Sequence, residues 1–214
     1  LKQDSLPFIE PAADSPQHPQ RILDRLESPG STPGILLTGP GGVGKTRTCL
    51  EVSRRAQDAG WRVLHIVPGE SLVVAKELRD LVLHGRSPTL LVFDYLDQLA
   101  HLDLGVIRHH LLPGAQERGM RVALLANARP ALFRRANHER DALFERIKID
   151  LTGIAPKIID RILETLAPNA MAQIGRDQAT RFSGTRPIIA MFIAREMERH
   201  ANQGTLAKLS LAQV

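Results

Sequence analysis

The pattern of hydrophobic and polar positions divides the chain into three parts. Residues 1–33 hold six of the fourteen prolines and little periodicity beyond an amphipathic stretch at 22–26, so we expect an irregular arm with one helix. From Gly34, short apolar runs alternate with longer helical stretches, and after Asp150 no strand pattern returns. The predicted organisation is therefore an arm and helix at 1–33, a core at 34–151 and a helical lid at 152–214.

Five short apolar runs predict the strands of the core. They are apolar throughout rather than alternating, which is typical of strands covered on both faces. The runs lie at 35–38, 62–67, 90–94, 122–126 and 147–149. Helical stretches near 45–59, 70–84, 98–118 and 130–145 lie between them. This alternation predicts right-handed crossovers and a five-stranded parallel sheet in a three-layer α/β/α fold.

The last part of the chain has only helical patterns. We expect three helices at 156–167, 170–182 and 187–203, with breaks at Pro168-Asn169 and Ser183-Gly184.

A phosphate-binding loop follows the first predicted strand and opens a helix, which is the context that such a loop requires. Its residues are Gly39-Pro40-Gly41-Gly42-Val43-Gly44-Lys45-Thr46, and we add Arg47 of the next turn to the nucleotide-contacting set. Glycines let successive backbone N–H groups turn inward toward a polyphosphate. Lys45 is expected to reach the β- and γ-phosphates, and the Thr46 hydroxyl to bind Mg²⁺. The alternative is a glycine-rich turn that matches by chance.

A second acid at the end of a neighbouring strand would complete the site. Asp94 ends the run 90–94 and is expected to hold Mg²⁺ together with Thr46. An Asp that caps the element after a buried strand is the alternative. Hydrolysis also needs a group that positions water, and Asp97 is the nearest acid after Tyr95. Asp97 could equally be the N-cap of a helix starting near Gln98.

The fourth predicted strand is followed by polar residues. If it lies between the phosphate-loop strand and the Asp94 strand, Asn127 or Arg129 would face the γ-phosphate. Arg129 is the expected catalytic or sensing residue, with a solvated loop arginine as the alternative. Arg134, Arg135 and Arg140 form a local basic stretch that we interpret as an exposed helix face, with an arginine finger for a neighbouring subunit or a nucleic-acid contact as the alternatives.

Charge and composition restrict the partners, metal sites and cellular location that we expect. The formal net charge of +5 is too mild to indicate nucleic acid by itself, although it leaves such a partner open. Cys49 is the single cysteine, which excludes an internal disulfide and a cysteine-built metal site. His109-His110 has no companions at ligand spacing, and Trp61 is expected to be structural. No apolar run is long enough to span a membrane, so we expect a cytoplasmic module.

Taken together, these motifs resemble the STAND class of signal-transduction ATPases, which is related to AAA+ proteins and includes NB-ARC domains. The resemblance rests on the Walker A segment, on Phe93-Asp94-Tyr95-Leu96-Asp97 as Walker B, and on the strand ending at Arg129. It implies that Asp97 is the catalytic acid. The segment 183–190 resembles the lid motif of the class, which implies that Pro187 meets the nucleotide and that Arg186 could act as a second sensor. The entry motif of the class is not recognisable around Phe8.

The resemblance implies a slow ATPase that switches between ATP-bound and ADP-bound arrangements, read by other domains of a longer chain or by self-association. We expect the strand order 5-1-4-3-2. One alternative is an AAA+ motor or loader acting on nucleic acid, with Arg134 or Arg135 as an arginine finger. Another is a nucleotide switch with negligible hydrolysis, which Tyr95 in place of an acid keeps open. A kinase is disfavoured because no acceptor-binding motif is present.

Overall fold

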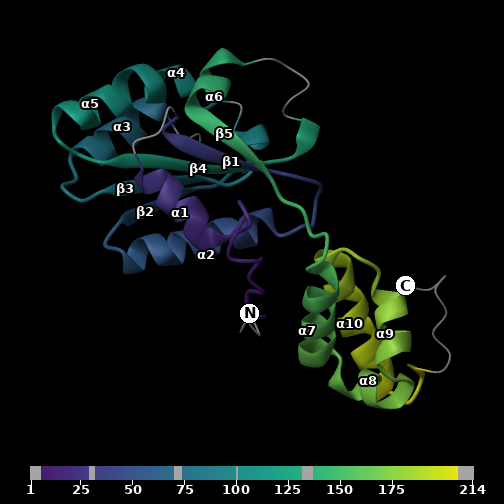
Figure 1. Ribbon diagram of the computed structural model, residues 1–214. Helices are drawn as coiled ribbons and strands as arrows, with labels where there is room; N and C mark the ends of the chain where they lie inside the picture. Colours follow the sequence, from purple (N-terminus) through teal and green to yellow (C-terminus); the bar gives the residue numbers. More distant parts are fainter. Residues whose placement is uncertain (1–5, 29–31, 70–73, 100, 132–136, 207–214) are drawn as a thin grey trace. The chain divides into compact units, whose positions relative to one another are not determined.

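The computed structural model describes residues 6–28, 32–69, 74–99, 101–131 and 137–206 (Figure 1). The chain divides into two compact units. A sheet unit contains Glu10–Gly41 and Lys45–Ile149, and a second unit, called the helical unit below, contains mainly the helices after Asp150 together with Gly42–Gly44. Among the described residues, no helix is long and apolar enough to cross a membrane.

The sheet unit is built on five parallel strands in the order β2-β3-β4-β1-β5. This is the predicted order 5-1-4-3-2 seen from the other edge, and the prediction is confirmed. The P-loop strand β1 and the Asp94 strand β3 therefore flank β4. The strands are β1 (Gly34–Thr38), β2 (Arg62–Ile66), β3 (Thr89–Phe93), β4 (Val122–Ala128) and β5 (Phe144–Lys148).

Helices cover both faces of the sheet (Figure 1). On one face lie α1 (Pro19–Glu27) and α2 (Lys45–Asp58). On the other lie α3 (Ala75–Leu83), α4 (Leu104–Val106), η2 (Ile107–Leu111) and α5 (Leu112–Glu117). Two short helices lie in the connections between strands: η1 (Leu96–Gln98) after β3, and α6 (His138–Leu143) before β5. Alternate strand residues point to opposite faces, so Leu91, Phe93 and Leu124 join the α3–α5 core. The central strands are buried on both sides, as their uninterrupted apolar runs predicted.

Two element boundaries differ from the sequence prediction. The helix expected from residue 98 begins at Leu104, where Asp103 is the N-cap and accepts bonds from the N–H groups of Gly105 and Val106 at 2.8 and 3.3 Å. A π-helical turn, η2, precedes Pro113, which cannot donate a backbone hydrogen bond. The fifth strand starts at Phe144 rather than 147, because Phe144 is buried in the same core and ends α6 early.

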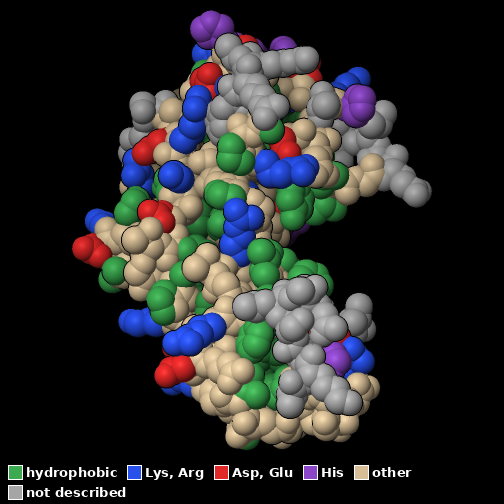
Figure 2. Space-filling model, turned by 90° about the vertical axis from the view of Figure 1, so that its right-hand side faces the viewer, with side chains coloured by type: hydrophobic (Ala, Val, Ile, Leu, Met, Phe, Trp, Pro, Cys, Tyr) green, Lys and Arg blue, Asp and Glu red, His purple; other side chains and the backbone are tan. Residues whose placement is uncertain are grey.

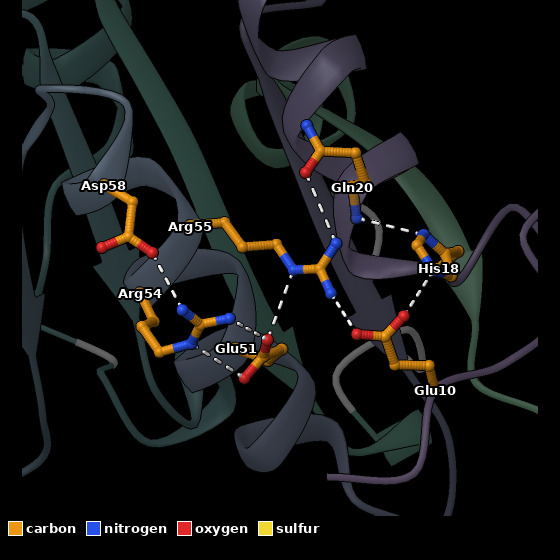
Figure 3. Close-up of polar contacts among 7 residues, drawn as sticks. All are labelled: Glu10, His18, Gln20, Glu51, Arg54, Arg55 and Asp58. Atoms are coloured by element: carbon orange, nitrogen blue, oxygen red, sulfur yellow. Dashed lines mark hydrogen bonds and ion pairs between the residues drawn. The ribbon is translucent and has the colours of Figure 1, made fainter.

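The arm before α1 is fixed to the P-loop helix by polar contacts (Figure 3). Glu10 forms an ion pair with Arg55 of α2, and its other oxygen lies 3.1 Å from Nε2 of His18. Nδ1 of His18 accepts the Gln20 N–H at 3.2 Å and so caps α1. Arg55 also contacts Glu51, 3.3 Å away in α2. The start of the sheet unit is therefore anchored to the helix that carries the phosphate loop.

The helical unit contains α7 (Ala155–Leu166), α8 (Pro168–Ile174), α9 (Arg176–Ser183) and α10 (Pro187–Asn202). The single helix predicted at 170–182 is wrong, since Gly175 has φ 79° and divides it. Residues such as Leu163, Ala194 and Met197 form a separate apolar core.

On the face drawn in Figure 2, basic side chains are scattered among other types rather than gathered into one field.

Candidate nucleotide-binding site

The phosphate loop connects the end of β1 to the first residue of α2, Lys45. Gly42 and Gly44 have φ values of 78° and 94°, in the left-handed region that side chains rarely adopt. A β-carbon placed on Gly41 or Gly44 would meet no atom within 4 Å, so there is open space beside the backbone at these two glycines. A backbone of this kind fits a polyphosphate, because its N–H groups can approach the ligand without steric hindrance.

Lys45 is oriented toward this loop. Lys45 is only 5% exposed, and its Nζ donates to the carbonyl oxygens of Gly39 and Pro40, both at 2.8 Å. An ammonium group has three donors, so one remains for a phosphate oxygen. Burial lowers the pKa of Lys45 below its ordinary value of 10.5, although nearby Asp97 opposes the shift and Arg129 reinforces it. A partly desolvated cation of this kind interacts strongly with an anion.

The Thr46 hydroxyl donates to Oδ1 of Asp94 at 2.9 Å, which joins the loop to the end of β3. Asp94 follows β3 directly, and its N–H donates to the Ile66 carbonyl of β2 at 2.9 Å. The hydroxyl and carboxylate oxygens are hard ligands of the type that Mg²⁺ prefers. Their pairing fits the ion that was expected from the sequence.

Asn127 connects β4 to the residues that follow β3. It lies within β4, is fully buried, and donates through Nδ2 to Oδ1 of Asp94. Its Oδ1 accepts the Tyr95 N–H at 3.1 Å. Tyr95 has φ 52°, the one left-handed non-glycine conformation within the described ranges, so the backbone turns sharply after Asp94. The sequence pattern had left Asn127 outside the strand, and its bridging contact was not predicted.

Arg129 pairs with Asp97, which lies in η1. Oδ1 of Asp97 accepts the Arg129 backbone N–H at 3.2 Å, and Oδ2 accepts Nε–H at 2.9 Å. The Asp97 side chain is 11% exposed and that of Arg129 is 49% exposed. Asp103, rather than Asp97, caps the following helix, so the capping alternative for Asp97 is wrong as stated. Both members of the pair act on the pKa of Lys45, so they lie within electrostatic range of the loop cation.

The other arginines that the sequence suggested as functional lie in different surroundings. Arg140 is 3% exposed and pairs with Asp141 at 2.9 Å, so the prediction that it lies on an exposed helix face is wrong. Arg134 and Arg135 fall outside the described residues. Arg47 is exposed in the first turn of α2.

In the helical unit, Arg186 is the N-cap residue of α10 and Pro187 is its first residue. Proline suits this position because a first-turn N–H has no intrahelical partner.

Elsewhere, Nε2 of His109 lies 3.3 Å from Glu139, and the described part of the chain holds no group of three His, Cys, Asp or Glu that could hold a metal.

Comparison with known proteins identifies the fold. No family model and no curated protein matches the chain. The structure resembles ORC1 from Aeropyrum pernix in complex with DNA, with a TM-score of 0.62 and 16% identity over 94% of this chain and 63% of that one. It also resembles the Hsp104–ADP complex from S. cerevisiae, with a TM-score of 0.61 and 14% identity over 94% of this chain and 32% of that one.

A further similar structure is the Holliday junction branch migration motor RuvB from Thermotoga maritima. Its TM-score is 0.55 and its identity 19%, over 89% of this chain and 61% of that one. The chain thus spans less than two thirds of each of these three relatives. These similarities show the fold alone: the chain has the fold that these AAA+ P-loop NTPase structures share.

Proposed function

We propose that the chain is a module that binds ATP with Mg²⁺ and hydrolyses it slowly. The observation that supports this most strongly is the 2.9 Å contact between Thr46 and Asp94, next to a buried Lys45 that faces its own glycine loop. Lys45 and the loop N–H groups bind the phosphates, with Arg47 beside them. Thr46 and Asp94 are the proposed Mg²⁺ ligands, and the ion supplies charge neutralisation at the phosphates when it is bound.

The water that attacks the γ-phosphate needs an orienting group, and Asp97 is the proposed residue. The ion pair with Arg129 fixes the Asp97 carboxylate, so that Arg129 acts on the water through Asp97. Asn127 has a separate task, since it holds Asp94 and the Tyr95 backbone in one arrangement. Three neighbouring strand ends therefore contribute to a single site.

Phosphate release in the presence and absence of Mg²⁺ tests the proposed site. Thr46→Val removes the hydroxyl with little change of volume, and we expect it to reduce Mg²⁺-dependent turnover by about 10²-fold. Thr48→Val is the matched control, because Thr48 is a buried threonine of the same helix and is not one of the proposed Mg²⁺ ligands. Equal turnover for wild type and Thr46→Val would refute the metal assignment.

The finer proposal is a STAND-type switch, in which residues 34–151 form the nucleotide-binding core and residues 152–214 form a lid. ATP and ADP must then bind two lid arrangements with different affinity, because a ligand indifferent to conformation shifts nothing. We expect amide exchange over residues 183–200 to differ between the ADP form and the form with a non-hydrolysable ATP analogue. Replacing Pro187 or Arg186 should reduce the difference and keep nucleotide binding. Identical exchange in both forms would leave a plain ATPase.

A motor or loader acting on nucleic acid is the second candidate, favoured by the similarity to RuvB and to ORC1 in complex with DNA. It predicts DNA-stimulated ATP hydrolysis and nucleotide-dependent assembly, both lost on replacing Arg134 or Arg135. The switch predicts turnover that is indifferent to DNA. Measuring turnover with and without duplex DNA separates the two.

A further inference from the structure

Four arginines gather at the amino-terminal edge of the sheet, the edge opposite the phosphate loop. Arg62 begins β2, Arg86 precedes β3, and Arg118 and Arg121 precede β4. Hydrogen bonds join these loops, from Arg62 N–H to the Pro88 carbonyl at 2.8 Å and from Thr89 N–H to the Arg121 carbonyl at 2.9 Å. Because adjacent strands lie about 4.8 Å apart, the starts of β2, β3 and β4, with the loops that carry these arginines, lie side by side along one edge of the sheet. We call them the amino-edge arginines.

Local contacts hold three of these side chains in place. Arg62 and Arg118 donate to the carbonyls of Leu81 and Leu83 at the end of α3, at 3.3 and 2.8 Å. The Arg121 guanidinium lies 5.1 Å from the centre of the buried Trp61 ring. Capping of α3 explains two of the four positive charges. It does not explain Arg86 or Arg121, both exposed.

The amino-edge arginines have no carboxylate partner among the described residues, whereas eleven other arginines have one. Arg54, Arg79, Arg129 and Arg176 are among those eleven. The nearby acids have other contacts: Asp80 pairs with Arg79, Asp58 with Arg54, and Glu27 accepts from Trp61 Nε1 at 2.9 Å. Two exposed carboxylates near the cluster have no ion pair with a described residue: Glu117 beside Arg118, and Glu27 at the Trp61 ring that Arg121 contacts.

We infer that the amino-edge arginines form a docking surface for an acidic segment of a partner polypeptide. Four guanidinium groups without an ion pair to a described residue leave an excess of positive charge along one edge of the sheet, and carboxylates placed among them would neutralise that charge. A guanidinium fork binds a carboxylate through two parallel hydrogen bonds, which a lysine cannot do.

Two observations favour carboxylates over nucleic acid at this edge. Single-stranded nucleic acid is held by stacking on exposed aromatic rings, but the aromatic ring in this cluster, Trp61, is only 5% exposed. Duplex binding commonly draws on about six to ten phosphate contacts, more than this compact cluster offers. The surface is remote from the phosphate loop, so a partner docked here leaves the nucleotide site accessible.

Fluorescence anisotropy at low salt tests the inference, with a labelled peptide of alternating Glu and Ser and a labelled random-sequence DNA duplex of equal charge. We expect saturable peptide binding. Arg86→Gln and Arg121→Gln should each weaken it about two- to fivefold, and the double variant about tenfold. Arg181→Gln is the matched control, because it removes one exposed arginine of the helical unit that forms no ion pair with a described residue. Affinity for ATP should be unchanged in every variant.

Three outcomes would overturn the inference: no saturable peptide binding by the wild-type protein, equal peptide affinity in Arg86→Gln and wild type, or tighter binding of the duplex than of the peptide. Thermal melting checks the fold of each variant. Should loss of the contact with Trp61 unfold Arg121→Gln, Arg86→Gln still decides, because the exposed Arg86 side chain forms no hydrogen bond or ion pair with a described residue.

Discussion

The pair formed by Asp97 and Arg129 gives the sharpest test of how the proposed site works. Asp97→Ala removes both contacts to Arg129, the ion pair at 2.9 Å and the backbone bond at 3.2 Å. Because the Arg129 side chain is 49% exposed, solvent screening limits the ion pair to about 0.2–1 kcal/mol. The backbone bond adds about 0.5–1.5 kcal/mol. We expect the free energy of unfolding to fall by about 1–2 kcal/mol for Asp97→Ala and by less for Arg129→Ala.

Turnover separates a positioning role from a sensing role for Arg129. Asp97→Asn should slow single-turnover hydrolysis by about 10²-fold and leave ATP affinity nearly intact. If Arg129 acts by holding Asp97, Arg129→Ala slows the reaction too, and the double variant is no slower than Asp97→Asn alone. Multiplicative effects would mean that Arg129 contacts the phosphate independently. Wild-type turnover in a folded Asp97→Asn variant would refute the assignment of Asp97.

Three further predictions concern buried groups around α2. Asn127→Ala removes a fully buried amide that holds Asp94 and the Tyr95 N–H, so chemical denaturation should reveal a loss of about 1–3 kcal/mol; a smaller change would mean that water replaces the amide. Ser53 Oγ is buried and has no hydrogen-bond partner among the described residues, so Ser53→Ala should raise the melting temperature through a gain of about 1 kcal/mol, and a decrease would reveal an ordered partner. Burial raises the pKa of Cys49 to about 12 from 9.0, so the unfolded chain loses this proton first as pH rises above 9.0. The free energy of unfolding should then fall by up to about 1.4 kcal/mol per pH unit, and an equally steep fall in Cys49→Ala would contradict this.

The sequence was sufficient for the sheet and the phosphate loop because both depend on local rules. Strands covered on both faces need continuous apolar runs, and Leu90–Phe93 or Ala123–Ala126 can hardly form anything else between helical stretches. The glycines and Lys45 identify the loop because few other residues could turn so many N–H groups inward.

The remaining features depend on tertiary contacts that local patterns do not encode. Asn127 is polar and appeared to end its strand, yet it is fully buried because Asp94 and the Tyr95 N–H satisfy its amide. Arg140 was expected in solvent and is buried beside Asp141. The amphipathic pattern continues across Gly175, so the sequence predicted one helix there. The φ of 79° at Gly175 breaks the helical backbone at that residue, which the pattern of side chains does not reveal.

Calorimetric titration of Mg²⁺-ATP into wild type and Lys45→Ala tests the central claim most directly. Lys45→Ala removes a charge-assisted phosphate contact of about 1.5–3 kcal/mol, so ATP affinity should fall by about ten- to a hundredfold. Lys76→Ala, an exposed lysine of α3, removes the same charge and should bind ATP as the wild type does. Unchanged affinity in a folded Lys45→Ala protein would contradict the proposed nucleotide site.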